Sequence, residues 1–186
     1  MSNRINSYIK GIGYYVPNQI IDNSYFEKFM DTSDQWIRER TGIEERRFIN
    51  EEQGPSDLAI PAVEMALENA QLKTDDIDFI IFATSTPDYY IPGSGCLIQD
   101  KMNFKNIGAL DIRCQCSGFI YAISIANQYI KTATYTNILV IAAEVQSTAM
   151  DLSNDGRNTS IIFADGAAAA VLSATKKNKG ILSTHL

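Results

Sequence analysis

Residues 108–130 read GALDIRCQCSGFIYAISIANQYI and carry the strongest structural signal in the chain. The run from Ala109 to Ile112 is short and mainly apolar, which suits a buried strand. From Ser117 onward, apolar residues recur at helical spacing and no residue interrupts a helix. These residues are Phe119, Ile120, Ile123, Ile125, Ala126 and Ile130. The segment therefore predicts a strand, a tight turn and a helix.

Cys116 falls on the predicted turn between this strand and this helix. Free backbone N–H groups and the positive end of the helix dipole favour a thiolate there. The small residues Ser117 and Gly118 would allow a ligand to approach closely. Cys116 is thus a candidate nucleophile, and the alternative is a buried structural cysteine, which is common in protein cores. We interpret Cys114 and Cys96 as structural.

The rest of the chain alternates strand and helix patterns. Further strands are expected over residues 7–16, 78–84, 137–143, 160–163 and 167–173, and residues 180–186 look like the opening of another. Helices are expected over residues 24–30, 33–40, 56–69 and 95–102. Asn23 or Ser24 would cap the first of these helices, with Glu27 completing a capping box, and Ser56 would cap the third. Such alternation predicts a layered α/β fold with a largely parallel sheet.

Composition excludes several classes of function. The 186 residues are 45% hydrophobic and 20% charged, which is typical of a globular protein with a real core. The formal net charge of −6 argues against general nucleic-acid binding. No apolar run has transmembrane length and no signal peptide is evident, so we expect a cytoplasmic protein that makes no membrane contact. Three cysteines and one histidine do not form a zinc-site pattern, so no metal is expected.

A second group of candidate residues surrounds the single tryptophan. Residues 32–47 read TSDQWIRERTGIEERR and place Trp36 among four arginines. An aromatic face beside guanidinium groups can stack an adenine and pair with phosphates. The alternative, equally weighted, is a core tryptophan on a helix whose arginines face water or pair with glutamates. Arg157 is a loop cation that could meet a phosphate or simply be solvated.

A thiolate nucleophile also needs a proton acceptor and an oxyanion hole. The backbone N–H of Cys116 can supply one donor to the hole. His185 is the one histidine, and it lies far from Cys116 in the predicted order of elements. If Cys116 is catalytic, its polar partners are outside this chain, and a cysteine hydrolase is disfavoured.

Several motifs occur together in the order seen in one family. They are Gly11-Ile-Gly-Tyr-Tyr-Val-Pro17, Thr32-Ser-Asp-Gln-Trp-Ile37, Arg40-Thr-Gly-Ile43, Cys116-Ser-Gly-Phe119 and Phe163-Ala-Asp-Gly166. With them the chain resembles β-ketoacyl-acyl-carrier-protein synthase III, a member of the thiolase superfamily. The resemblance implies a layered α-β-α thiolase-like fold. It also implies that residues 1–186 are one N-terminal condensing-enzyme domain, half of a duplicated architecture whose C-terminal half is absent.

The resemblance also assigns roles by position. Cys116 matches the residue that accepts an acyl group from acyl-coenzyme A. Trp36 matches the residue stacked on the adenine of coenzyme A. Further matched contacts to coenzyme A are Thr32, Arg40 and Arg157. The matched acyl-pocket residues are Ile91, which crosses a dimer interface in the family, and Phe163.

The implied activity is a decarboxylating Claisen condensation of an acyl-Cys116 thioester with malonyl-acyl carrier protein, which initiates fatty acid or related ketide synthesis. Coenzyme A thioester is a substrate, and no resident cofactor is implied. The family is homodimeric, and its histidine and asparagine donors lie in the second half, so we expect this chain to be inactive alone. The alternative is a non-catalytic half-chain that assembles with a separate C-terminal half. Arg113-Cys-Gln115 and Tyr89-Tyr90 depart from the commonest family pattern and leave the acyl preference open.

Overall fold

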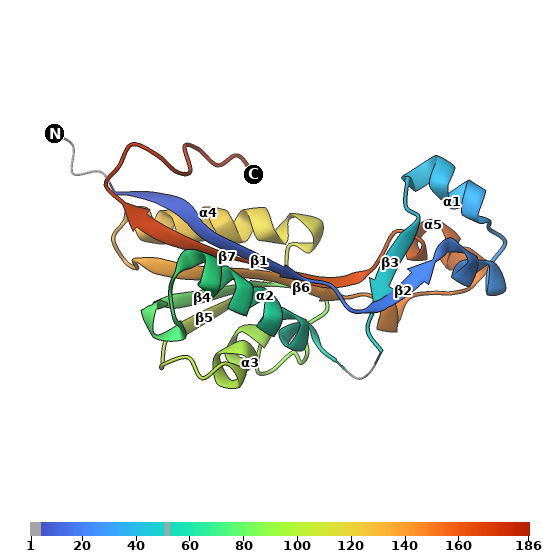
Figure 1. The fold of residues 1–186 in the computed structure, drawn as a ribbon, viewed down its shortest axis with the longest axis horizontal. Helices are drawn as coiled ribbons and strands as arrows, with labels where there is room; N and C mark the ends of the chain where they lie inside the picture. Colours follow the sequence, from blue (N-terminus) through green and yellow to red (C-terminus); the bar gives the residue numbers. More distant parts are fainter. Residues whose placement is uncertain (1–4, 51–52) are drawn as a thin grey trace.

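The computed structural model describes residues 5–50 and 53–186 and contains a five-stranded sheet with a smaller two-stranded sheet beside it (Figure 1). The five-stranded sheet has the order β1-β7-β6-β4-β5 and comprises β1 (Asn6–Tyr15), β4 (Phe79–Ala83), β5 (Gly108–Ile112), β6 (Asn137–Val145) and β7 (Asp165–Thr175). The smaller sheet pairs β2 (Gln19–Asp22) with β3 (Glu45–Phe48). The α-helices are α1 (Asp34–Thr41), α2 (Pro55–Ala70), α3 (Ser94–Lys101), α4 (Gly118–Lys131) and α5 (Arg157–Ser160). Short 3-10 helices are η1 (Asn23–Lys28), η2 (Thr74–Asp76), η3 (Gln115–Ser117), η4 (Ser147–Ala149) and η5 (Asn154–Gly156).

The large sheet is mixed, so the prediction of a largely parallel sheet was wrong for half of it. β4 runs parallel to both β5 and β6, and a helix connects each successive pair of these strands. β7 is antiparallel to β6 and to β1. The reason is the connection through residues 146–164, which extends beyond the sheet instead of crossing its face, so that β7 starts at the same end of the sheet where β6 stops, with Asp165 paired to Val145.

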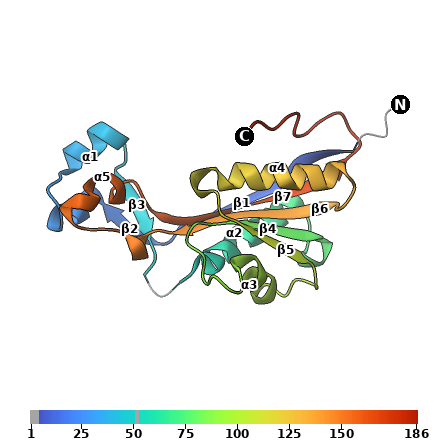
Figure 2. The same ribbon diagram turned by 180° about the vertical axis from the view of Figure 1, so that it is seen from behind.

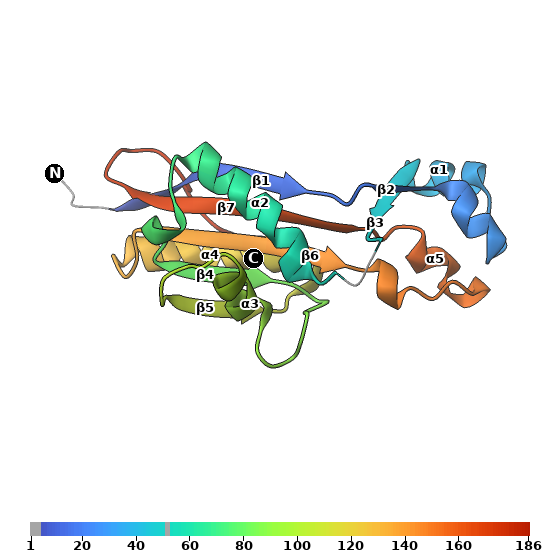
Figure 3. The same cartoon turned by 60° about the horizontal axis from the view of Figure 1, so that its bottom comes forward.

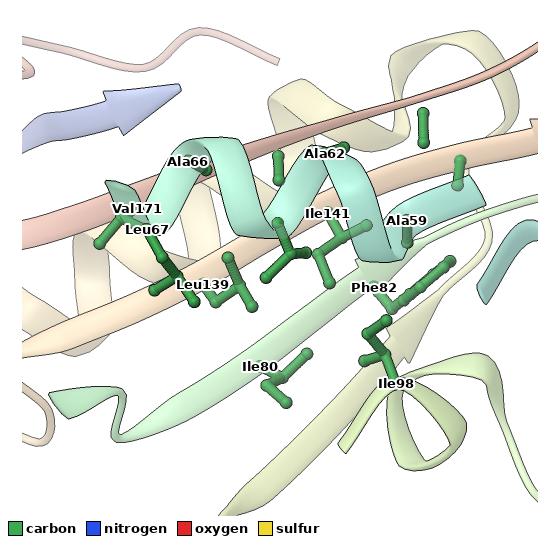
Figure 4. Packing of buried hydrophobic residues seen from close by; sticks show 14 of the residues in the cluster. Ala59, Ala62, Ala66, Leu67, Ile80, Phe82, Ile98, Leu139, Ile141 and Val171 are labelled. Atoms are coloured by element: carbon green, nitrogen blue, oxygen red, sulfur yellow. The ribbon is translucent and has the colours of Figure 1, made fainter. Parts of the chain in front are cut away.

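Helices cover both faces of the large sheet and give the molecule its layers. Helices α2 and α3 lie on one face and α4 on the other (Figures 1 and 2). Figure 4 shows α2 side chains such as Ala62 and Leu67 packed over Leu139 and Ile141 of β6. Across the sheet, Ala122 and Ile130 of α4 pack against the opposite faces of β4, β6 and β7. The expected α-β-α layering is confirmed.

Beyond one end of the large sheet lies a small lobe, which we define as residues 19–48 and 146–164. It contains η1, α1, α5 and the β2–β3 pair (Figure 1). Its own apolar core includes Phe26, Ile37 and Ile161, all nearly inaccessible to solvent. The lobe therefore packs together two segments that are about a hundred residues apart in the sequence.

Most predicted elements are present, and four details were wrong. Residues 160–163 are the end of α5 and a turn rather than a strand, and residues 180–186 form no strand, although Ile181 N donates to Ser7 O (2.9 Å). Residues 109–112 form a half-exposed edge strand rather than a buried one. The strands β2 and β3 were not expected.

The helix caps also differ from the prediction. Asp22, not Asn23 or Ser24, caps η1 by accepting from Tyr25 N (3.2 Å), and Glu27 instead accepts from the first residue of α1. Gly54 is the N-cap of α2, which leaves Ser56 buried inside the first turn. For η1, Asp22 lies one residue before Asn23 and its side chain offers the same kind of acceptor. Aspartate, asparagine and serine are about equally favourable N-caps, so N-cap preference does not choose between neighbouring candidates. In the described part of the chain, no helix is both long enough and apolar enough to span a membrane.

Candidate functional site

Cys116 lies where the sequence predicted it, between an edge strand and a helix. It follows β5 on η3, immediately before α4, and its side chain is exposed. The turn is tight because Gln115 has a positive φ of 44°, and Ser117 Oγ donates back to Cys114 O (2.8 Å) rather than capping the helix. A Cβ at Gly118 would lie 3.2 Å from Ala83 Cβ, so the small residue lets α4 begin directly against β4. The N-terminal end of α4 is turned toward the small lobe (Figure 2).

The other two cysteines were both interpreted as structural, but they differ in solvent exposure. Cys114 is half-buried, whereas Cys96 is exposed on α3, so the interpretation of Cys96 as a buried structural residue was wrong. Its position in the first turn of a short helix at the protein surface explains the exposure. All three cysteines are free thiols.

His185, the one histidine, is exposed near the end of the chain. Its Nε2 lies 3.2 Å from Ser183 Oγ, two residues away. Among the described residues, no cluster of three His, Cys, Asp or Glu side chains could hold a metal ion. The groups that the described residues place at this turn are the exposed Cys116 thiol and the start of α4.

Trp36 is the centre of a stack of cationic side chains in the small lobe. The guanidinium carbon of Arg40 lies 4.0 Å from the centre of the Trp36 ring, and that of Arg157 lies 4.7 Å from it. Arg157 Nη1 also donates to Asp31 O (2.8 Å), and Arg40 Nη1 donates to Trp36 O (3.3 Å). An exposed cation–π contact contributes about 0.5–1 kcal/mol. A planar aromatic ring beside two cations can recognise a planar base that carries phosphate.

The local sequence explains why α1 presents Trp36 in this way. Ser33 Oγ caps the helix by accepting from Trp36 N (3.1 Å), and Gly42 ends it with a φ of 70°. Ile37 is the buried residue of α1, whereas Trp36 is half-buried. Arg38 forms ion pairs with Asp34 (2.8 Å) and Glu44 (2.7 Å), so it takes no part in the stack. Trp36 packs against the edge of the lobe core, and Arg38 pairs with a glutamate, so the alternative interpretation is confirmed in part alongside the cationic stack.

Thr32 precedes α1 and is half-buried. Its Oγ1 is inaccessible to solvent and has no hydrogen-bond partner among the described residues. A buried hydroxyl without a partner costs free energy, because it has lost its hydrogen bonds to water. Thr32 lies on the same lobe as Trp36, Arg40 and Arg157, so all four predicted coenzyme A contacts are on the small lobe.

The two predicted acyl-pocket residues, Ile91 and Phe163, line no common cavity among the described residues. Ile91 is 91% exposed, on the loop between β4 and α3 that reaches away from the sheet in Figure 3. Phe163 is half-buried just before β7. A cavity of about 140 Å³ lies at the base of the loop, lined by Tyr89, Tyr90 and Arg113 among others, but neither Ile91 nor Phe163 contributes to it.

Sequence reasoning missed the carboxylates that anchor this loop. Asp88 accepts hydrogen bonds from Ser56 Oγ and Ser94 Oγ (2.7 Å each), which joins the loop to the starts of α2 and α3. At the loop's other end, Glu144 of β6 accepts from Ser85 N and Ser85 Oγ (2.9 Å each). The sequence does show an acidic residue near the carboxyl end of a strand or in the loop that follows one. The serines that donate to these two carboxylates lie on other elements, so the sequence alone does not identify the contacts.

Replacement of Asp88 by asparagine is expected to destabilise the protein. Ser56 and Ser94 are fully buried, and an amide nitrogen in place of one carboxylate oxygen cannot accept from a hydroxyl. We expect the free energy of unfolding to fall by about 1–3 kcal/mol, as measured by urea denaturation. Asp100→Asn on the exposed side of α3 is the matched control and should change it by less than about 0.5 kcal/mol. Equal effects in both variants would show that the Asp88 contacts contribute nothing specific.

Comparison with known proteins agrees with this arrangement. A family model described as 3-oxoacyl-[acyl-carrier-protein (ACP)] synthase III matches residues 110–186. The β-ketoacyl-[acyl-carrier-protein] synthase III of Fusobacterium nucleatum is 48% identical over 174 residues, which cover 94% of this chain and 52% of that protein. That of Clostridioides difficile is 49% identical over 178 residues, which cover 96% of this chain and 53% of that protein.

A solved structure gives the same result for the fold. The crystal structure of 3-oxoacyl-[acyl-carrier-protein] synthase III from Aquifex aeolicus superposes with a TM-score of 0.87 at 42% identity, and the match covers 92% of this chain and 55% of that one. The chain spans about half the length of the relatives that it matches. By sequence and by its thiolase-like α/β fold, the chain is similar to the N-terminal half of β-ketoacyl-acyl-carrier-protein synthase III proteins.

Proposed function

We propose that this chain is the N-terminal half of an enzyme that condenses an acyl group from acyl-coenzyme A with malonyl-acyl carrier protein. The observation that carries the proposal is the presence in one chain of two features. One is an exposed cysteine at a strand-to-helix turn, and the other is the stack of Trp36 with Arg40 and Arg157. A thiol at the start of a helix is suited to receive an acyl group, and a stack of this kind is suited to hold a nucleotide thioester. The printed names of the relatives specify the same synthase activity for those proteins.

In the first half-reaction the adenine of acyl-coenzyme A stacks on Trp36, beside Arg40 and Arg157, and Thr32 Oγ1 gains a hydrogen-bond partner. The Cys116 thiolate attacks the thioester carbonyl, a bond forms between Sγ and the acyl carbon, and the bond to the coenzyme A sulfur breaks. Coenzyme A leaves as a thiol after taking up one proton. The backbone N–H of Cys116 donates to the oxyanion.

In the second half-reaction malonyl-acyl carrier protein loses carbon dioxide to give an enolate. The enolate carbon attacks the acyl carbon on Cys116, the new carbon–carbon bond forms, and the thiolate leaves. The enolate oxygen needs positioned donors. His185 is the one histidine of this chain and lies on its exposed terminal segment, so we assign these donors to the C-terminal half and expect the chain alone to be inactive. Coenzyme A enters as a substrate, and the proposal assigns no resident cofactor.

We also propose a homodimer and a cytoplasmic location. β5 is an edge strand whose outer side has no partner strand among the described residues, and such an edge favours pairing with a second copy. Tyr90 and Ile91 are 86% and 91% exposed on the neighbouring loop, a position suited to entering the acyl pocket of a partner. The three free thiols fit a reducing compartment.

The test is product analysis with this chain assembled with its C-terminal half. Incubation with acetyl-coenzyme A and malonyl-acyl carrier protein should yield acetoacetyl-acyl carrier protein and one carbon dioxide per turnover. Acetyl-acyl carrier protein as the sole product would mean plain acyl transfer and would contradict the condensation. A series of longer acyl-coenzyme A substrates then defines the acyl preference.

Removal of the indole should weaken coenzyme A binding selectively. In Trp36→Ala the adenine loses its stacking surface, which is worth about 1–3 kcal/mol for a base on an aromatic side chain. We expect the KM for acyl-coenzyme A to rise about 5- to 150-fold while kcat changes little. The matched control is Tyr14→Ala, which removes an aromatic side chain of β1 that is 64% exposed and should leave the KM unchanged. A KM in Trp36→Ala equal to that of the unaltered protein would show that the adenine binds elsewhere.

A second candidate function is a non-catalytic subunit that assembles with a separate C-terminal half. The observation in its favour is exposed apolar surface: Ile12 and Tyr14 of β1 are 55% and 64% exposed, and Ile120 of α4 is 50% exposed. Co-purification of a stable pair that is never acylated by acyl-coenzyme A would favour this function. Acylation of the pair by acyl-coenzyme A would exclude the non-catalytic function.

A further inference from the structure

Arg46 of β3 is a buried guanidinium in the core of the small lobe, and the proposed reaction gives it no role. Its side chain is 5% exposed and lies over the ring of Phe26, with the guanidinium carbon 4.7 Å from the ring centre. Arg46 Nη2 donates to Asn23 Oδ1 (2.8 Å) and Ile161 O (3.0 Å). Arg46 Nη1 donates to Ile21 O (3.3 Å). One side chain therefore bonds both to residues 21–23 and to Ile161, which lie on the two separate segments of the lobe.

In the part of the chain that the structure describes, this buried guanidinium has no ion-pair partner. Within the described residues, no carboxylate oxygen lies within 4.0 Å of it, and Arg46 Nε has no hydrogen-bond partner. Burial lowers the pKa of Arg46, and the charge of Asp22 offsets this only in part. A buried charge held by neutral acceptors costs more free energy than an apolar side chain of similar size. Stability of the lobe is therefore a poor reason for an arginine here.

The partners of Arg46 lead to the two sides of the tryptophan stack. Asn23 is fully buried, and its Nδ2 donates to Asp34 Oδ1 and to Ile43 O (2.8 Å each). Asp34 is the first residue of α1, two positions before Trp36, and hydrogen bonds from Arg38 and Asn23 lower its pKa. On the other side, Ile161 directly follows α5, whose first residue is Arg157. Through Asn23 and Ile161 the Arg46 guanidinium links the helix that carries Trp36 to the helix that carries Arg157.

We propose that Arg46 is a positioning residue for nucleotide binding, one that fixes the distance between Trp36 and Arg157. The inference rests on the proposed use of this stack by coenzyme A. Arg46 is inaccessible and touches no substrate, so its effect passes through Asn23 and Ile161. The planar fork of arginine donates from Nη2 to Asn23 and Ile161 and from Nη1 to Ile21 O, whereas the ammonium of a lysine is a point charge that cannot reproduce this two-nitrogen geometry. The identity of residue 46 therefore sets how well the stack accepts a planar base.

The test compares two acyl donors on Arg46→Lys in the assembled enzyme. Acetyl-coenzyme A carries the adenine nucleotide, and acetyl-N-acetylcysteamine is the same thioester without it. We expect the KM for acetyl-coenzyme A to rise about tenfold with kcat within about twofold, because only nucleotide binding is lost. Acylation of Cys116 by the truncated donor should be unchanged. Arg47→Lys, the next residue of β3, is the matched control and should alter the kinetics with neither donor, because within residues 5–50 and 53–186 the Arg47 side chain bonds only to Pro17 O and Glu45.

Each other outcome has a definite meaning. Unchanged kinetics of Arg46→Lys with acetyl-coenzyme A would overturn the positioning role while leaving the proposed function intact. Equal losses with both donors would also overturn it, since they would indicate general damage to the fold. If the unaltered enzyme is acylated by neither donor, the proposed function itself fails. Asn23→Ser removes the same link from its other end, so should Arg46→Lys not fold, this variant must show the same selective rise in KM.

Discussion

Cys116→Ala is expected to abolish the covalent acyl adduct and to lower the condensation rate by at least about a thousandfold. The physical reason is that alanine offers no nucleophile at the start of α4, whereas the helix, the turn and the stack around Trp36 are unchanged. Binding of coenzyme A, followed by quenching of the fluorescence of Trp36, should therefore be retained. Trp36 is the single tryptophan of these 186 residues, so this chain contributes no other indole to the signal.

Cys114→Ala is the matched control for this variant. It removes a thiol two residues away on the same turn, one that is half-buried rather than exposed. We expect Cys114→Ala to retain the acyl adduct. An adduct that persists in Cys116→Ala and disappears in Cys114→Ala would show that Cys114, and not Cys116, is the nucleophile.

Gly13→Ala is expected to give the largest loss of stability of any conservative substitution in β1. A Cβ at this position would lie 2.0 Å from Ala62 O and 2.5 Å from Ala66 N, both backbone atoms of α2. Neither atom can move without displacing the helix, so the strand and helix must separate. We expect the free energy of unfolding to fall by about 3 kcal/mol and the melting temperature by about 6–12 °C, as measured by calorimetry.

Gly166→Ala on the neighbouring strand β7 is the control for a simple glycine effect. A Cβ there would meet its nearest atoms at 3.4 Å and 3.6 Å, which is ordinary van der Waals contact. We expect the stability of Gly166→Ala to stay within about 0.5 kcal/mol of the unaltered protein. Similar melting temperatures for the two variants would contradict the close approach of β1 to α2.

The parts of the fold that the sequence predicted are those with a strong local signal. Residues 79–83 form a strand buried on both faces, and residues 118–131 form a helix with one apolar face, as their patterns indicated. The segment 160–163 also has β-forming residues, yet Ile161 is buried in the lobe core while its backbone turns. Tertiary packing overrides propensity there, and no local pattern marks a two-strand lobe whose halves are distant in sequence.

In the candidate site, too, the residues with a local sequence signal were predicted and those that depend on distant partners were not. Cys116 was found from its position on a turn, and Trp36 from its surrounding arginines, because both signals lie within about fifteen residues. The contact of Arg157 with Trp36 joins residues from distant segments. The sequence around Arg157 gives no sign of this contact and, without the family resemblance, favours a solvated cation. Asp88 and Arg46 act through partners on several elements, so only the assembled structure identifies them.

The most direct test of the central claim is the intact mass of the assembled enzyme before and after incubation with acetyl-coenzyme A, followed by peptide mapping. Our account predicts a gain of one acetyl group per copy of this chain, located on Cys116. No gain in mass would contradict the account, and so would an acetyl group found on Cys96 or Cys114 instead.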